Sequence, residues 1–270
     1  MPAPHTLLEV RTSQDSQQTI EAATQLFATV PTLRNAIWWQ LLKQDEHLSF
    51  ELVVKKQTIF FQLFVPTRLS EYVQGSIRAN YPQAVITPLN LSSAHKNNKT
   101  NRANQLEVDP LRAIFSAQND PQCDTNLKFG VLKLKNKEYL PLKTYQDFSE
   151  IDPLAPLLST LAKTQPQEQI VIQLVLADDG SRWKNQGFQQ ISHQSSQLQE
   201  LADLANKSGS HPQKNLIKKK LDERGLKTSI RLAVDSANPQ RSKLLLETIA
   251  SSLQAITQSE GNDLVLSKPW

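Results

Sequence analysis

The sequence predicts a mixed α+β protein of two modules, each an antiparallel sheet with helices on one face. Strand and helix patterns follow one another in the order βαββαβ twice along the 270 residues. This order is typical of the ferredoxin-like arrangement. The length also exceeds the usual domain size of about 100 to 200 residues, which predicts either two domains or one elaborated domain.

The first module is predicted to occupy residues 1–90. Residues 7–11 are apolar and β-branched, as in a strand, and apolar side chains then recur at helical spacing between residues 20 and 30. In residues 48–54 and 59–65, apolar side chains stand at every second position, as Leu48, Phe50, Leu52 and Val54 and then as Ile59, Phe61, Leu63 and Val65. That alternation predicts a β-hairpin with one buried face.

The last helix and strand of this module come before a polar segment. Apolar residues at helical spacing predict a helix over residues 69–80, Pro82 prevents its continuation, and residues 84–87 are typical of a strand. Residues 91–126 follow as a polar linker, because most of their side chains are too polar to order the segment by burial.

The second module is predicted to occupy residues 127–270. It begins with two strands, at residues 129–134 and 139–144. A helix follows, with Asp152 in the capping position and Pro153 at the first helical position. Residues 170–177 form a nearly continuous apolar run, which is typical of a strand buried on both faces.

The rest of this module contains an insertion. Residues 181–222 are expected to form a mostly polar helical insertion, and residues 229–234 the next strand. Asn238 and Pro239 begin the last helix, and residues 264–266 form the closing strand. Apart from the insertion and the additional strand at residues 139–144, the second module again has the order βαββαβ.

The composition predicts a protein of the reducing cytoplasm. Cys123 is the only cysteine, and the chain opens without the pattern of a secretory leader. No stretch approaches the roughly 20 apolar residues that span a bilayer, so any membrane contact is expected to be peripheral, at the inner face. The net charge of +4 permits DNA contact but does not by itself indicate it.

No motif in the sequence indicates catalysis, a cofactor or a metal. The seven glycines form no phosphate-binding loop, and the five histidines lack the close spacing of metal ligands. Asp178 and Asp179 end a buried strand, where catalytic carboxylates often lie, but with Gly180 they also fit a polar turn. An enzyme would need a pocket of scattered residues such as Asp178, His193 and Tyr145.

The densest basic cluster lies at the end of the insertion and just after it. Such a cluster binds phosphate groups by charge, or it forms a solvated helix face. No aromatic residues are interleaved in it for base stacking, which favours the solvated face. The residues of this candidate phosphate or DNA contact are Lys214, Lys218, Lys219, Lys220, Arg224 and Lys227.

A pair of tryptophans lies between the first helix and the hairpin. Trp38 and Trp39, with Leu42 close by, present more apolar surface than a simple connection requires. They are candidates for docking a partner or a membrane surface. Alternatively, one indole packs under the sheet and the other against a helix, since tryptophan is usually largely buried.

Several segments, in this order, resemble one protein family. They are SFELVVKKQTIFFQLFVP at 49–66, LSEYVQGSIRANYPQAVITP at 69–88, EYLPLKTYQDFSEIDPLAPLLSTLAK at 138–163, the strand at 170–177 and SRW at 181–183. Together they resemble the N-terminal, non-motor region of the conjugative type IV secretion ATPases that transfer DNA in small-genome bacteria.

The resemblance implies an interaction or assembly module of a DNA-transfer apparatus. The partners it implies are a cognate secretion ATPase or channel components, with a second copy of the chain as a further candidate. In the family, a motor domain with nucleotide-binding motifs follows this region. Because this sequence reaches Trp270 without those motifs, ATPase activity is not expected.

The alternative to an assembly role is a nucleic-acid-binding α+β protein. Four-stranded sheets of this class often bind RNA through exposed aromatic side chains, and the chain is basic. Against this alternative, Phe50 and Phe61 share the parity of the apolar residues of the hairpin, which predicts that both are buried in the core.

Overall fold

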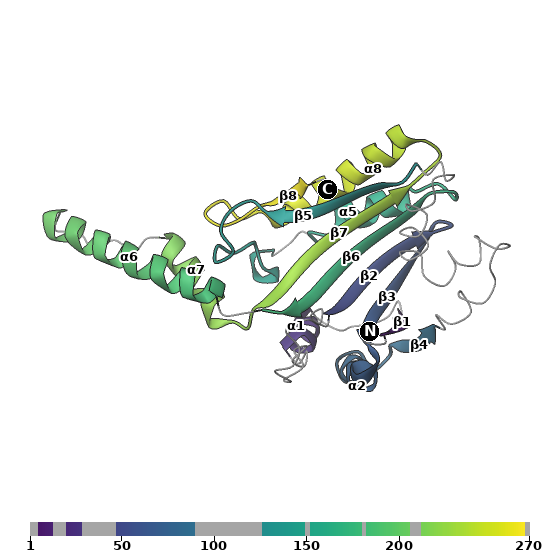
Figure 1. Ribbon diagram of the computed structural model, residues 1–270, viewed down its shortest axis with the longest axis horizontal. Helices are drawn as coiled ribbons and strands as arrows, with labels where there is room; N and C mark the ends of the chain where they lie inside the picture. Colours follow the sequence, from purple (N-terminus) through teal and green to yellow (C-terminus); the bar gives the residue numbers. More distant parts are fainter. Residues whose placement is uncertain are drawn as a thin grey trace, which may run out of the picture.

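The strands of the protein form one continuous antiparallel sheet. The computed structural model describes residues 5–12, 20–28, 47–89, 126–148, 152–179, 182–205 and 212–267. Within them the strands are β1 (His5–Arg11), β2 (His47–Lys55), β3 (Thr58–Pro66), β4 (Val85–Leu89), β5 (Lys128–Leu134), β6 (Gln169–Asp178), β7 (Leu226–Asp235) and β8 (Leu264–Ser267). Their order across the sheet is β4-β1-β3-β2-β6-β7-β5-β8 (Figure 1).

Six α-helices accompany the sheet in the described residues. They are α1 (Ile20–Ala28), α2 (Ser70–Asn80), α5 (Ala155–Ala162), α6 (Arg182–Ala205), α7 (Pro212–Asp222) and α8 (Pro239–Ser252). The helices α1, α2, α5 and α8 pack against one face of the sheet. The helices α6 and α7 project beyond the sheet at one end (Figure 1). The mixed α+β class with antiparallel strands is therefore confirmed.

The two predicted sheets are joined into one. Strands β2 and β6 pair antiparallel over nine residues, from His47 opposite Ala177 to Lys55 opposite Gln169. The expectation of separate sheets is therefore wrong. The physical reason is that an outer strand leaves a row of backbone N–H and C=O groups unpaired, and each of these two strands satisfies the other's row.

The first hairpin turns in two residues, and the second carries an insertion. Between β2 and β3, Lys56 and Gln57 both have positive φ, 49° and 62°. That is the geometry of the tight turn that matches the twist of a hairpin. Between β6 and β7, the equivalent connection contains α6 and α7. The helical insertion expected near residues 181–222 therefore extends from a hairpin end.

Two cores lie on the helix-covered face. One joins α1 and α2 to the strands through residues such as Leu8, Leu48 and Ile77. The other joins α5 and α8 to the strands through residues such as Ile170 and Ile249. We call the opposite face the helix-free face, because no helix of the described ranges packs on it.

Three details differ from the sequence predictions. Residues 139–144 are not a strand, since Pro141 has no N–H to donate and its carbonyl accepts from Asn262 N at 2.8 Å. The helix after Asp152 begins at Ala155, and the Asp152 side chain accepts from Leu154 N at 2.8 Å. Phe61 is 49% exposed, so its predicted burial in the core is wrong.

Candidate functional site

The most distinctive feature of the molecule is an arm formed by α6 and α7. The helix α6 has 24 residues, which corresponds to about 36 Å, and it extends past α7 and away from the sheet (Figure 1). A small separate core joins the two helices to the loop between β5 and α5. It contains Leu140, Trp183, Ile217 and Leu221, with Tyr139 and Ile191 packed against it.

Two glycines allow the arm to pack closely at its base. A Cβ atom on Gly187 would lie 2.8 Å from Leu221, and a Cβ atom on Gly225 would lie 2.5 Å from the buried ring of Trp183. Real Cβ atoms do not approach other atoms so closely. Gly225 is therefore required in this packing because the Trp183 ring is rigid, whereas a Cβ atom on Gly187 would displace the end of the flexible Leu221 side chain. The base of the arm is therefore closely packed, and we call this packed region the joint.

Two lysines strengthen this joint through backbone carbonyl groups. Lys184 Nζ donates to Leu221 O at 2.8 Å and to Glu223 O at 2.6 Å. Lys220 Nζ donates to Leu140 O at 3.1 Å and to Glu138 O. Both ammonium groups also lie over the Trp183 ring, 5.6 and 5.5 Å from its centroid.

Burial lowers the pKa of Lys220, and the nearby charges of Glu138 and Asp179 partly oppose that shift. The ammonium group is therefore held by the carbonyl groups in a partly desolvated place. Its role in this structure is to connect α7 to the loop before α5.

The structure assigns different surroundings to the members of the predicted basic cluster. Lys219 Nζ donates to Gln146 Oε1 at 2.7 Å, and Arg224 lies 3.6 Å from the carboxylate of Asp178. Lys218 and Lys227 are exposed. The first four lysines of the cluster lie on α7, Arg224 follows that helix, and Lys227 lies on β7.

A row of polar side chains crosses the helix-free face. The register places Glu9, Gln62, Glu51, Gln173 and Arg231 opposite one another on five adjacent strands. The middle three are buried, at 6, 6 and 8% exposure. The polar row therefore passes through the β2–β6 junction that joins the two halves of the sheet.

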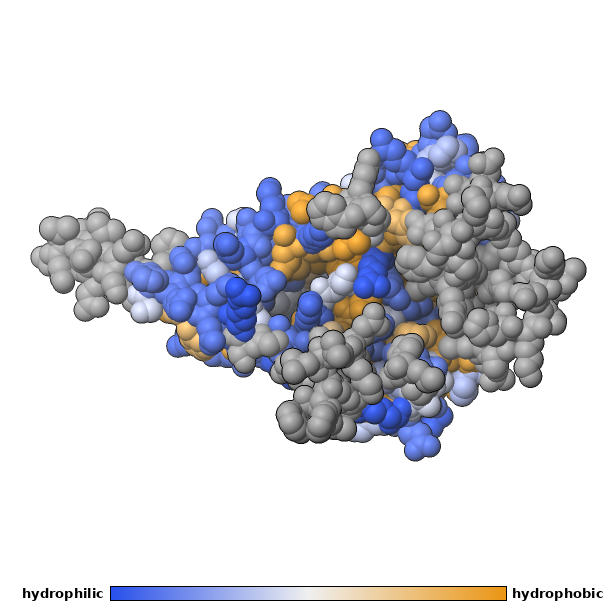
Figure 2. Space-filling view, viewed as in Figure 1, coloured by the Kyte–Doolittle hydropathy of each residue, from blue (hydrophilic) through white to orange (hydrophobic). Residues whose placement is uncertain are grey.

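Hydrogen bonds link the centre of the polar row. Glu51 Oε1 accepts from Gln173 Nε2 at 2.8 Å and from Ser49 Oγ at 2.7 Å. The Oε1 atoms of Gln62 and Gln173 are buried without a hydrogen-bond partner. Beside the row, Val53, Val171 and Ala233 form a small buried apolar cluster. Figure 2 shows apolar residues gathered over β5 and β7 on the face in view.

Two histidines that are distant in sequence lie together near the end of this face. The rings of His5 and His47 are 5.4 Å apart, and His5 stacks on Phe64 at 4.4 Å. Sequence spacing could not have found this pair, because the residues lie on different strands. No group of three potential metal ligands occurs in the described ranges.

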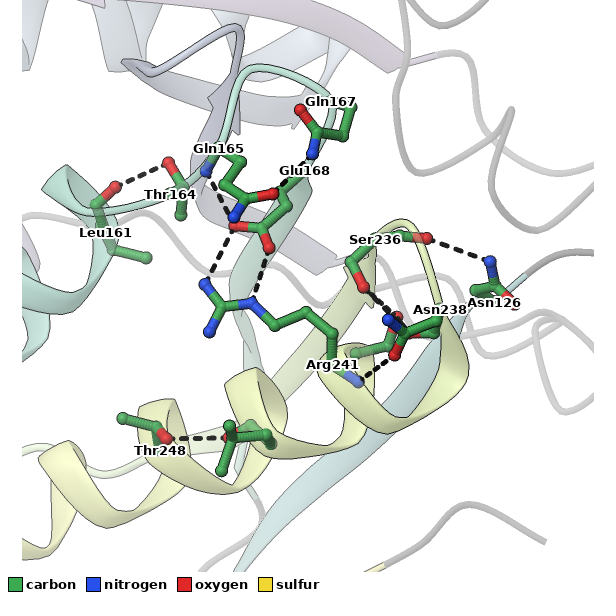
Figure 3. A network of polar contacts seen from close by, with 12 residues as sticks. Asn126, Leu161, Thr164, Gln165, Gln167, Glu168, Ser236, Asn238, Arg241 and Thr248 are labelled. Atoms are coloured by element: carbon green, nitrogen blue, oxygen red, sulfur yellow. Dashed lines mark hydrogen bonds and ion pairs between the residues drawn. The ribbon is translucent and has the colours of Figure 1, made fainter.

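A polar network connects the loop before β6 with α8 and is structural in character (Figure 3). Glu168 is 1% exposed and accepts from Arg241 Nε at 2.7 Å and from Gln165 N at 2.8 Å. Asn238 caps α8, because its side chain accepts from Arg241 N at 2.7 Å. The network thus fastens the loop before β6 to the start of α8.

The other candidate residues fall in separate places. Trp38, Trp39 and Leu42 lie outside the described residues. Asp178 ends β6, and His193 is eleven residues beyond the start of α6, about 16 Å along that helix. This separation does not favour a shared pocket with Asp178. In the described ranges, no helix is long and apolar enough to cross a membrane.

The fold and the arm define a class: an α+β protein on a single antiparallel sheet, with a helical projection at a hairpin end. Comparison with family models makes the assignment specific. The chain belongs to the family described as a domain of unknown function (DUF8128), whose model matches residues 2–264. No curated protein matches the chain.

Proposed function

We propose that the chain is a non-catalytic assembly module of a conjugative type IV secretion apparatus, the machine that transfers DNA. The resemblance of the hairpin, the following helix and the segment before β6 to the secretion ATPase family supports this proposal. In this role the chain binds a cognate secretion ATPase or a channel component on the cytoplasmic side of the membrane.

The observation that carries the proposal is the anchored arm. A helix of about 36 Å that projects from a sheet buries less of its own surface than it would against a core. The base is nevertheless fixed by Trp183, two close-packed glycines and two lysines. A projection with so defined a base suits a contact with another protein more than it suits catalysis.

We also propose that the sheet consists of two ferredoxin-like modules. The strand order β4-β1-β3-β2 of the first half is repeated in the second half as β8-β5-β7-β6. In each half, one helix follows the first strand and one follows the third. This topology supports module boundaries at about residues 1–90 and 127–270, with residues 91–126 between them.

The test uses the exposed side chain Phe188 on α6, which is 55% exposed. Phe188→Asp is compared with Leu244→Asp, because Leu244 on α8 is 56% exposed and also lies on a helix. The purified chain is mixed with the motor ATPase of the same organism's secretion system, and binding is measured by biolayer interferometry. We expect Phe188→Asp to weaken binding at least tenfold and Leu244→Asp to leave it unchanged.

Trp38→Ala with Trp39→Ala is a second variant in the same assay, since the tryptophan pair is the other predicted docking surface. Loss of binding in that variant alone would move the contact from the arm to the tryptophan segment. No binding by the wild-type chain to the motor or to the channel proteins would refute the assembly proposal.

A second candidate function is nucleic-acid binding. The observation that favours it is the excess of positive charge on α7 and the residues after it. The predicted burial of Phe50 and Phe61 was the argument against nucleic-acid binding. That argument is weaker now, since Phe61 is half exposed and not in the core.

A further inference from the structure

The positive charge of the chain is concentrated in one place. Residues 212–227, which we call the basic segment, contain six lysine and arginine residues and two acidic ones. This excess of four positive charges equals the net charge of +4 of the whole chain, so the other residues are balanced. Figure 2 shows the described part of the arm as hydrophilic over most of its visible surface.

The contacts distinguish two groups among five of the six basic residues, and the sixth, Lys214, is partly buried. Lys220 is committed to the joint at the base of the arm, and Arg224 faces Asp178. Lys218, Lys219 and Lys227 are exposed. Lys218 and Lys227 form no ion pair with any residue in the described ranges. The exposed group is therefore able to bind an external anion without dismantling the joint.

The apolar residues of α7 restrict the class of partner. Ile217 is 0% and Leu221 is 3% exposed, because both belong to the core of the arm. A basic helix that binds a membrane inserts an apolar face, and a protein interface centres on apolar or aromatic anchors. Two of the three leucine and isoleucine residues of this helix are therefore already in use, and the third, Leu216, is partly buried. Phosphate groups need charge alone, so they fit the remaining surface best.

We propose that Lys218, Lys219 and Lys227 bind the phosphate backbone of a nucleic acid strand. Lysine ammonium groups are compact point charges that contact phosphates without reading bases. Binding is therefore independent of sequence and sensitive to salt. This inference deepens the second candidate function and does not depend on the assembly role.

The test measures binding of the full chain to a labelled 20-nucleotide single strand of mixed sequence by fluorescence anisotropy. The variant is Lys218→Gln, Lys219→Gln and Lys227→Gln together. The matched control removes three exposed lysines elsewhere, by Lys135→Gln, Lys137→Gln and Lys163→Gln. Both variants lose the same charge, and circular dichroism checks that both are folded.

The expected result is a difference in salt dependence. Each phosphate contact to a single strand contributes a slope of about −0.7, so three contacts weaken binding about 20-fold between 50 and 200 mM salt. We call the variant without Lys218, Lys219 and Lys227 the arm variant. Between 50 and 200 mM salt, the factor by which binding weakens should be about 20 times larger for the wild-type and control proteins than for the arm variant. Equal behaviour of the two triple variants would overturn the proposal, since general charge would then explain the binding.

A competitor separates nucleic acid from acidic protein as the partner. Unlabelled single-stranded DNA should displace the probe at a lower concentration of negative charges than polyglutamate does. Equal displacement would overturn the nucleic-acid assignment in favour of an acidic protein surface. If the arm variant loses DNA but still binds the secretion motor, the assembly role stands. If the wild type binds DNA but no motor, the assembly role fails and this inference stands.

Discussion

At the scale of single residues, Glu168 shows how a buried charge is kept ionised. Burial acts to raise the pKa of its carboxyl, but hydrogen bonds from Arg241 and Gln165 N outweigh burial and lower it below the ordinary value of 4.5. A carboxylate with a lowered pKa stabilises the fold above its unfolded pKa, and that contribution is lost as the pH falls through the folded pKa.

This predicts a pH-dependent effect of Glu168→Gln. At pH 6 to 7 the variant should unfold with a free energy roughly 1 to 3 kcal/mol below the wild type, because charged hydrogen bonds are lost. The difference should shrink as the pH falls from the ordinary pKa of 4.5 to the lowered pKa of folded Glu168, because the unfolded chain then binds a proton that the folded carboxylate does not. Urea unfolding between pH 3 and pH 7 measures it. A constant difference over that range would contradict the assigned pKa direction.

At the scale of elements, the joint of the arm depends on a glycine. Gly225→Ala would bring a Cβ atom against the Trp183 ring, which is rigid and buried, so roughly 1 to 3 kcal/mol of local stability should be lost. Hydrogen exchange in α7 should accelerate by about 5- to 140-fold, since about 1.4 kcal/mol corresponds to tenfold.

The matched control for this prediction is Gly75→Ala in the middle of α2. A Cβ atom there meets nothing within 4 Å, so alanine should stabilise the helix by roughly 0.5 to 1 kcal/mol. Exchange in α7 should stay unchanged in this variant. If both glycine variants accelerate exchange in α7, the clash with Trp183 is not the cause.

The elements that could be predicted from sequence are those whose signal is local. The hairpin of β2 and β3 and the helices α2 and α8 lie where periodicity and capping residues place them, and Asn238 is the observed cap. The strand prediction for residues 139–144 was wrong because their apolar residues pack in two different cores and form no strand ladder: Tyr139 and Leu140 pack in the core of the arm, and Leu142 packs against the core of α5 and α8. Tertiary contacts with Asn262 decide that segment, and no local pattern reports them.

The candidate site was predicted only in part, for the same physical reason. The basic residues 214–227 were found because they are close in sequence. The division between Lys220 as an anchor and Lys218 as an exposed charge depends on the three-dimensional position of Leu140 O. The polar row and the pair of His5 and His47 depend on strand register, which only the assembled sheet defines.

At the scale of the whole molecule, the β2–β6 junction couples the two halves. Nine paired residues and the buried contact between Glu51 and Gln173 connect the two strands. Each strand also contributes to both cores, β2 through Leu48 and Val54 and β6 through Leu176 and Ile170. Removing either half would expose the edge of the other. The sheet should therefore unfold as one cooperative unit, even if the halves arose as separate modules.

A core substitution in the first half tests this coupling. Ile77→Ala in α2 removes a side chain that is 3% exposed, and such changes cost about 2 to 5 kcal/mol. If the sheet opens as one unit, hydrogen exchange should accelerate in β7 as well as in β3, although β7 lies in the other half. Arg78→Ala, at an exposed position of the same helix, should change neither strand. Faster exchange in β3 with unchanged exchange in β7 would mean that the two halves unfold independently despite the shared sheet.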